Sequence, residues 1–248
     1  HNLLLSKQWL IQILQKITRQ PGVIYSALTP NLRGFEAAMA ANTHEVVIFG
    51  SASESFAKNN INCSIEESLA RFKPVADAAK KHGVRLRGSI SCAFDCPTEG
   101  RTPLQNVINV VRRMRDLGCD EIDIADTTGK ATPDQVREVM QHAAQEFPIN
   151  QLSGHFHDTY GRALDNIQAS MEVGIHIFHS SVAGLGGCPY AKGATGNVAT
   201  EDVLTLMQEQ DIETGVDMNK VVDAGQFISN ELKRPYSVPV VNTAKGQM

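Results

Sequence analysis

Short β-branched stretches alternate with longer amphipathic segments along most of the chain. Each β-branched stretch is short enough for a buried strand, and they occupy residues 23–28, 45–50, 84–91, 121–126, 152–157 and 175–182. Between them, apolar side chains recur at helical spacing, as in the stripe Ile65, Leu69, Phe72, Ala76 and Ala79. The alternation predicts right-handed strand-helix-strand units, and hence a parallel sheet covered by helices.

Capping signals indicate where several of the helices begin. A threonine stands directly before a proline, the favoured residue of a first helical turn, at Thr29, Thr102 and Thr132. The spacing of a capping box occurs at Ser64 with Glu67, Thr102 with Gln105, and Thr132 with Gln135. Residues 3–17 also show helical periodicity, which ends before Pro21 and Gly22. That segment therefore predicts a helix and not a further strand.

A sheet of this kind is either closed as a (β/α)8 barrel or open and doubly wound. The sequence has no G-x-G-x-x-G after the first strand and no phosphate-binding P-loop, so the nucleotide-binding open folds lose their usual support. We expect one α/β domain over residues 1–248, of the (β/α)8 TIM-barrel type. About six of its eight strands are recognisable.

Composition narrows the class of protein further. Hydrophobic residues make up 42% and charged residues 20%, which suits a globular chain with a sizeable core. The net charge of -4 disfavours a nucleic-acid partner, and no apolar run is long enough for a membrane span. The five cysteines, an odd number in a chain of this size, favour reduced thiols and a cytoplasmic location.

Two histidines stand one residue apart in the fifth predicted strand. Side chains alternate along a strand, so His155 and His157 share one face with Ser153, while apolar neighbours occupy the other face. That places both imidazoles inside the barrel at the carboxyl end of the strand, where barrel enzymes carry their chemistry. A divalent metal site and a pair of hydrogen-bonded structural histidines both fit this pattern.

Other candidate residues lie at the same end of the predicted barrel. The glycine-rich loop 183–197 follows the last strand, and it carries Cys188 and Asn197 as a mobile lid would. Arg87 faces the interior and needs an anion, either a substrate carboxylate or Asp126. Asp126 ends its own strand and could alternatively cap the helix that follows.

Further cysteines and histidines are interpreted as structural. Cys92 and Cys96 lack a second cysteine pair that would complete a zinc site, so we expect buried thiols. Several histidines show no matched partner in the sequence and are expected to be structural or exposed: His44, His82, His142, His176 and His179.

Several motifs together resemble the 3-hydroxy-3-methylglutaryl-CoA lyase family. They are SGHFHDTYG, VAGLGGCPYAKGATGNVATED, FAKNNINCSIEES, RGSISCAFDCP and DIADTTG, and the lyase-like region covers residues 14–235. The segment GGCPYA distinguishes this family from the related condensing enzymes. The resemblance implies a metal-dependent (β/α)8 enzyme that cleaves an acyl-CoA thioester into acetoacetate and acetyl-CoA, a step of leucine catabolism and ketone-body metabolism.

The resemblance also implies roles for individual residues. Metal ligands would be His155, His157 and Asn197, holding Mg²⁺ or Mn²⁺ or, less in keeping with oxygen donors, Zn²⁺. The base would be His155, assisted by Asp126. Cys188 would return a proton to the product enolate, and Arg87 would neutralise developing charge. Substrate-binding positions at the margin of the site would be Asn60, Ser89 and Glu201.

The sequence departs from the family pattern at its start. Residues 1–13 match nothing in the family, and the Arg-Asp pair of its first strand, which supplies a fourth ligand and a cation, is absent. Ser89 stands where animal enzymes have tyrosine. A barrel without two of its strands would expose sheet edges, so we expect a homodimer. A related acyl-CoA lyase or condensing enzyme, and a non-catalytic barrel fragment, remain alternatives.

Overall fold

Six parallel strands form the main sheet of the protein. The computed structural model describes residues 12–186 and 196–236. Within these residues the strand order is β1-β2-β3-β6-β7-β8, and every pairing in this sheet is parallel. The strands are β1 (Ser26–Leu28), β2 (Glu45–Ser51), β3 (Arg85–Ser91), β6 (Glu121–Asp126), β7 (Leu152–Phe156) and β8 (Ile177–His179). The six predicted strands are thus confirmed, in the predicted order along the chain.

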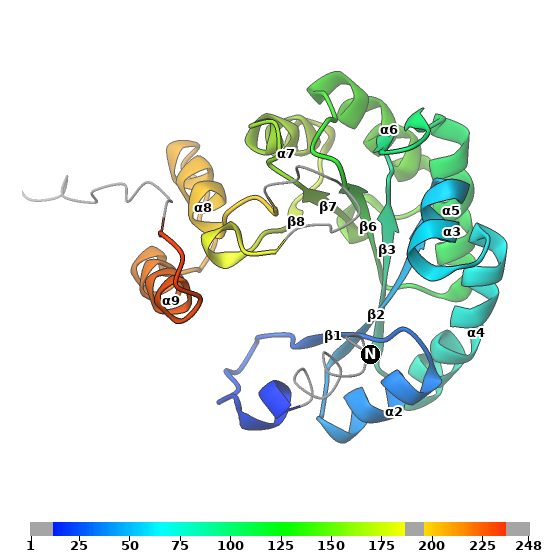
Figure 1. Cartoon of the computed structure of the whole chain (residues 1–248), viewed down its shortest axis with the longest axis horizontal. Coiled ribbons are helices and arrows are strands. Elements are labelled where there is room, and N and C mark those ends of the chain that lie inside the picture. Colours follow the sequence, from blue (N-terminus) through cyan, green and yellow to red (C-terminus); the bar gives the residue numbers. More distant parts are fainter. Residues whose placement is uncertain (1–11, 187–195, 237–248) are drawn as a thin grey trace, which may run out of the picture.

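Helices follow the strands and cover the outer face of the sheet (Figure 1). The sheet curves as half of a barrel, with β1 and β8 as its outermost strands among the described residues. A small hairpin of β4 (Asp95–Cys96) and β5 (Gly100–Arg101) follows β3. The helices are α2 (Leu32–Ala40), α3 (Glu54–Ile61), α4 (Ile65–His82), α5 (Leu104–Leu117), α6 (Pro133–Glu146), α7 (Ala163–Val173), α8 (Thr200–Glu209) and α9 (Met218–Glu231), with 3-10 turns η1 (Ile149–Gln151) and η2 (Val182–Gly184).

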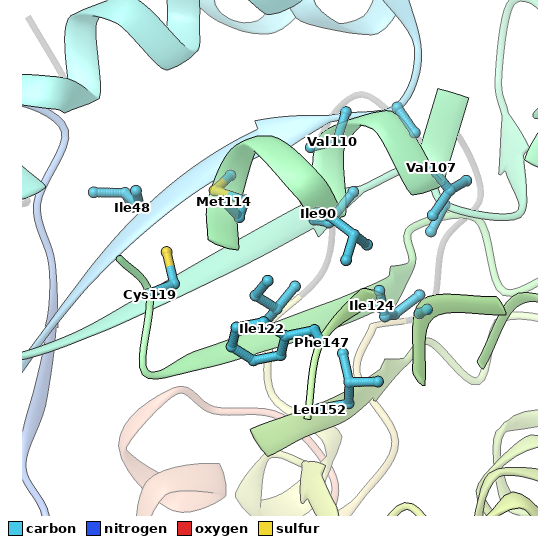
Figure 2. Close-up of a cluster of buried hydrophobic side chains, with 14 of the residues drawn as sticks. Ile48, Ile90, Val107, Val110, Met114, Cys119, Ile122, Ile124, Phe147 and Leu152 are labelled. Atoms are coloured by element: carbon cyan, nitrogen blue, oxygen red, sulfur yellow. The ribbon is translucent and has the colours of Figure 1, made fainter. Parts of the chain in front are cut away.

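The hydrophobic core lies between this sheet and its helices. Figure 2 shows apolar side chains of α5, among them Val107 and Met114, beside the outward-facing isoleucines of the strands. Met114 is fully buried, and burial of a side chain of this size contributes about 1.5–3 kcal/mol. The helix approaches closely because Gly88 has no side chain: a Cβ there would lie 2.8 Å from the Met114 sulfur. The packing thereby fixes β3, which carries Arg87, against α5.

The predicted helix starts are only partly confirmed. Ser64 and Thr132 each form a complete capping box, with Glu67 and Gln135. Thr102 caps no helix, because its hydroxyl donates to the Cys92 carbonyl oxygen at 2.7 Å and Pro103 is the N-cap residue instead. The expectation for Thr29 is also wrong. Its hydroxyl donates to the carbonyl oxygen of Val47, and Asn31 caps α2.

The start of the chain agrees with the helix prediction where it is described. Residues 12–16 are helical, and Leu14 is buried in the core. The remainder of the predicted helix, residues 3–11, lies outside the described residues. Among the described helices, none combines the length and the apolar character needed to cross a membrane.

Candidate active site

The inner face of the sheet carries an unusually polar set of side chains. Alternation along β7 turns Ser153 and His155 inward, as the sequence predicted, and His157 follows directly after the strand. Parallel pairing places His155 level with His179 of β8 and with Ala125 of β6. The side chains of three neighbouring strands therefore meet on the concave side of the half barrel.

His155, His157 and Asn197 converge, as expected for the three proposed ligands. The ring centroids of the two histidines are 5.5 Å apart, and the Asn197 Oδ1 lies 3.0 Å from the His155 Nε2. His157 also forms an isolated β-bridge with Asn197. The His157 Nδ1 is buried without a hydrogen-bond partner, so a nitrogen lone pair is available there. This donor set fits a divalent cation, and the assignment of these three ligands stays a prediction.

Burial keeps both imidazoles neutral. Desolvation, together with the neighbouring His155, lowers the pKa of His157 to about 4. Desolvation also lowers the pKa of His155, against the opposing effect of Asp123. A neutral imidazole has a free lone pair, so at neutral pH each ring can bind a metal or accept a proton.

Arg87 faces the interior, and its protein partners do not include Asp126, one of the two anions considered from the sequence. Its Nε lies 3.7 Å from the Glu45 carboxylate, and its Nη1 lies 4.0 Å from Glu121 and 2.9 Å from the Nε2 of His179. Asp126 is not among these partners, so that alternative is wrong. Two buried glutamates at the starts of β2 and β6 hold the guanidinium instead.

Asp126 organises its own loop. The carboxylate accepts hydrogen bonds from the backbone amides of Gly129, Lys130 and Ala131, at 3.0, 3.3 and 3.0 Å. Burial nevertheless raises its pKa to about 6, because the three amides only partly compensate for desolvation. This geometry agrees in part with the capping alternative, although Thr132 is the N-cap of α6. Assistance of His155 by Asp126 stays a prediction.

Two interior residues were missed from the sequence. Asp123 of β6 and His179 of β8 join His155 in a group whose candidate ligand atoms all lie within 4.8 Å of one another, a group that could hold a metal ion. His179 was expected to be merely structural or exposed. Its position on β8, two residues after Ile177 and level with His155, was the available signal, but reading it requires the strand register.

The three predicted substrate-binding residues are placed differently from one another. Ser89 points inward, and its hydroxyl donates to Asp123 at 2.8 Å. Asn60 lies in the last turn of α3. No hydrogen bond or ion pair within the described residues joins Asn60 to His155. Glu201 is buried at the start of α8, where its carboxylate accepts from the Ala183 amide and from the Tyr236 hydroxyl.

The ends of the glycine-rich loop are fixed beside the histidines. The Asn197 side-chain amide donates to the Leu185 carbonyl oxygen at 2.9 Å, and its backbone amide donates to the Gly186 carbonyl oxygen at 3.3 Å. Ala183 adopts a left-handed φ of 55°, stabilised by Glu201. Cys188 itself lies outside the described residues, two positions after Gly186 in the sequence.

The other cysteines are buried thiols, as expected. Cys63, Cys92, Cys96 and Cys119 are all buried and not disulfide-bonded. Burial on its own would raise the pKa of Cys96, but hydrogen bonds from Ser53 and Thr98 lower it to about 7. These contacts connect the start of α3 with the β4-β5 hairpin. No cysteine pair with a metal-site pattern occurs within the described part of the chain.

A parallel half barrel with histidine, carboxylate and amide groups on its inner face is typical of α/β-barrel enzymes that act on small molecules. The HMGL-like family pattern matches residues 6–228. The chain belongs to this family. It is 54% identical over 217 residues to a 3-hydroxy-3-isohexenylglutaryl-CoA/hydroxy-methylglutaryl-CoA lyase of Pseudomonas aeruginosa, covering 88% of this chain and 72% of that protein. The resemblance inferred from the motifs is therefore confirmed.

Further relatives and solved structures support the same family assignment. The mitochondrial hydroxymethylglutaryl-CoA lyase of Homo sapiens is 47% identical over 229 residues, which span 92% of this chain and 70% of that protein. The crystal structure of hydroxymethylglutaryl-CoA lyase from Pseudomonas aeruginosa superposes with a TM-score of 0.89 at 51% identity, covering 92% of this chain and 76% of that one. A lyase of Acenitobacter baumannii in complex with coenzyme A and 3-methylmalate has a TM-score of 0.89 at 32% identity, with coverage of 96% and 79%.

Proposed function

We propose that the chain is a carbon-carbon lyase that cleaves 3-hydroxy-3-methylglutaryl-CoA to acetoacetate and acetyl-CoA. The observation that carries this proposal is the convergence of His155, His157 and Asn197 beside the two ends of the loop that bears Cys188. Relatives at 54% and 47% identity are named as lyases of this substrate class, and a structural neighbour binds coenzyme A. An acyl-CoA thioester is accordingly the proposed small-molecule partner.

In the proposed retro-Claisen reaction, each of the site residues has a separate role. A divalent cation at His155, His157 and Asn197 would supply Lewis acidity toward the substrate hydroxyl and carboxylate oxygens. The one lone pair of a neutral imidazole serves only one of these roles, metal ligand or base, at a time. While His157 and Asn197 would keep the cation, His155, which is neutral because burial lowers its pKa, takes the hydroxyl proton and starts the cleavage. Cleavage leaves the electron pair on the thioester enolate, and Cys188 on the loop donates the proton that forms acetyl-CoA. Arg87 contributes positive charge to the interior.

In this proposal the buried carboxylate of Glu201 positions the glycine-rich loop. It accepts hydrogen bonds from the backbone amide of Ala183, the first residue of the glycine-rich loop, so Glu201 fixes this end of the loop. Asn60 and Ser89 retain their proposed places at the margin of the substrate site. Mg²⁺ or Mn²⁺ is the proposed ion, with Zn²⁺ as the competing one, since imidazole and amide ligands accept all three.

A thioester cleavage assay tests the proposal. Purified protein is incubated with 3-hydroxy-3-methylglutaryl-CoA and Mg²⁺ or Mn²⁺, and acetoacetate is measured. We expect Cys188→Ala and His157→Ala to lower kcat/KM by about a hundredfold or more. The matched controls, Cys63→Ala and His142→Ala, remove a buried thiol and an exposed imidazole elsewhere, and they should keep activity. Full activity in both site variants would refute these assignments.

A longer-chain substrate is a second candidate. The relative from Pseudomonas aeruginosa carries a name that includes 3-hydroxy-3-isohexenylglutaryl-CoA, and Ser89 is a small residue on the inner face. The same assay run with both thioesters separates the two candidates through their kcat/KM values. Synthesis of a thioester adduct without cleavage would instead favour a condensing enzyme. Absence of both activities and of divalent-ion binding would favour a non-catalytic barrel.

Location and assembly are also proposals. Relatives are named as cytoplasmic in Danio rerio and as mitochondrial in Homo sapiens, so the family occurs in both places. We favour the cytoplasm because the described cysteines are unbridged thiols. We also propose a homodimer, in which the sheet edges gain a partner.

A further inference from the structure

The segment that follows α9 returns to the start of the glycine-rich loop. α9 lies beside η2 (Figure 1), and the backbone amide of Arg234 donates to the Ser229 carbonyl oxygen at 3.0 Å, which turns the chain back along the helix. The Arg234 Nη2 then donates to the carbonyl oxygen of Ala183. The Tyr236 hydroxyl donates to the Glu201 Oε1 at 3.0 Å. Two side chains of this segment therefore contact the residues that hold the loop.

Ala183 is held at both of its backbone polar groups. Its amide donates to the two carboxylate oxygens of Glu201, each at 3.0 Å, while its carbonyl oxygen accepts from Arg234. The φ of Ala183 is 55°, a strained conformation for a residue with a Cβ. Such a conformation persists only where the surrounding structure fixes it. Glu201 on one side and Arg234 on the other do so here.

The contact between Tyr236 and Glu201 depends on close packing against α9. A Cβ on Gly225 of that helix would lie 2.5 Å from the Tyr236 Cε2 and 2.7 Å from the Glu201 Oε1. Burial and the neighbouring Glu201 raise the pKa of Tyr236 to about 12, so the phenol keeps its proton at neutral pH. It thereby remains a donor to a carboxylate that is only 2% exposed and needs donors.

Hydrogen bonds lead from Ala183 to the proposed ligand Asn197. The carbonyl oxygen of Leu185, two residues after Ala183, accepts from the Asn197 Nδ2 at 2.9 Å. The Oδ1 of the same amide lies 3.0 Å from the His155 Nε2. Because the side-chain amide is planar, fixing its nitrogen also fixes the direction of its oxygen. The backbone at Ala183 and Leu185 therefore sets where the Asn197 oxygen points.

We propose that Arg234 and Tyr236 are positioning residues, which act through Ala183 and Leu185 to aim the Asn197 oxygen at the divalent cation. The inference rests on the proposed function, because that function makes Asn197 a ligand. It adds that the segment after α9, which supplies none of the proposed ligands, controls the affinity for the ion. Groups behind a ligand commonly have this effect.

Metal binding and thioester cleavage by the same variants test the inference. The chain is titrated with Mn²⁺, and free Mn²⁺ is followed by electron paramagnetic resonance. We expect Tyr236→Phe and Arg234→Ala each to weaken Mn²⁺ binding by about tenfold and to lower kcat by a similar factor, with KM for the thioester nearly unchanged. Arg234→Lys, which keeps a donor, should restore part of the affinity.

Two matched controls remove the same groups at the other side of the sheet. Tyr25→Phe removes a hydroxyl that accepts from the Gln20 amide, and Arg19→Ala removes a guanidinium that donates to the Ala41 carbonyl oxygen. Thermal unfolding measures the stability that each variant loses. The controls should lose stability but keep the wild-type Mn²⁺ affinity and kcat, so a general loss of stability cannot mimic the expected result.

A double-mutant comparison decides between positioning and an unrelated effect. In an Asn197→Ala background, Tyr236→Phe should cause no further loss of Mn²⁺ affinity, because the oxygen that it positions is gone. An equal loss in both backgrounds, or wild-type affinity in Tyr236→Phe and Arg234→Ala, would overturn the inference while wild-type cleavage upholds the proposed function. If Arg234→Ala does not fold, Tyr236→Phe, which deletes one oxygen atom, decides. A wild-type chain that neither binds Mn²⁺ nor cleaves the thioester would refute both.

Discussion

Burial of single imidazoles links the candidate site to the stability of the protein. His157 is 6% exposed, and desolvation lowers its pKa to about 4, well below the value of an unfolded chain. In a folded chain the ring therefore resists protonation, while in the unfolded chain it accepts a proton near pH 6.5. The stabilising contribution is present above that pH and is lost as the pH falls toward 4.

We predict that His157→Gln makes stability less sensitive to acid. Between pH 7.5 and pH 5.0 the wild type should lose about 2 kcal/mol more unfolding free energy than the variant, because the buried imidazole cannot take its proton. Urea unfolding at the two pH values measures the difference. Asp126 acts in the opposite direction, since its raised pKa favours folding in acid, and it is present in both proteins. Equal acid sensitivity would contradict the pKa of His157.

Residue by residue, the sequence predicts side-chain direction better than side-chain partners. Alternation correctly placed His155 and Arg87 on the inner face. It did not reveal that Arg87 contacts Glu121 and His179, because those contacts depend on register across four strands. The long side chain of an arginine can also extend beyond the residue paired with it on the adjacent strand. The strand pairing alone therefore does not identify the partner of its guanidinium group.

At the scale of elements, close approaches between loops hold the candidate site in place. Gly129 lies in the loop between β6 and α6 with a φ of 71°. A Cβ there would lie 2.8 Å from the Thr159 Cβ and 2.9 Å from the His157 carbonyl oxygen. The loop that Asp126 organises is thus pressed against the chain that follows β7. Only a residue without a side chain allows this contact.

We predict that Gly129→Ala destabilises the protein by about 2–4 kcal/mol and also weakens metal binding, because it combines a strained φ with a steric clash. Gly118→Ala is the matched control: Gly118 has a φ of 86° but open space around a would-be Cβ. It should cost only about 1 kcal/mol and leave metal binding intact. Denaturant unfolding and Mn²⁺ titration of both variants give the comparison. Similar losses in the two would show that the close approach is unimportant.

Helix starts illustrate what local sequence can and cannot predict. The boxes at Ser64 and Thr132 form because both partners lie within one turn and need nothing else. Thr102 has the same local pattern, but a backbone carbonyl oxygen of Cys92 competes successfully for its hydroxyl. That carbonyl is ten residues away, in the turn after β3, so the competition is tertiary and has no local signature.

For the whole molecule, the outermost strands of the sheet are the feature that bears on the proposed homodimer. β1 and β8 are the outermost strands among the described residues, and apolar side chains lie exposed at or before β1: Val23 (47%), Ile24 (52%) and Leu28 (55%). Strand number and order followed from the alternation of elements, since parallel strands need helical crossovers. How the edges are satisfied did not follow, because it depends on contacts beyond the pattern of one chain.

We predict that the protein self-associates through the β1 edge. Leu28→Lys should shift sedimentation velocity profiles toward the monomer at micromolar concentration, since a charge on an edge strand opposes pairing. Ile149→Lys, on the 3-10 turn η1, changes a residue that is also exposed but lies away from β1. This control should keep the wild-type profile. A monomeric wild type, or equal effects of the two substitutions, would exclude the β1 edge as the interface.

The position of His179 on an outermost strand has a consequence for local opening. β8 is only three residues long and pairs with β7 alone among the described strands, so its amides should exchange with solvent faster than those of β3 or β6. Asp123, His155 and His179 come from three successive strands. An ion bound to these three side chains would hold β8 against β7 and β6 and so oppose the local opening of β8. Binding of the ion would then be measurable as slower deuterium uptake at residues 177–179.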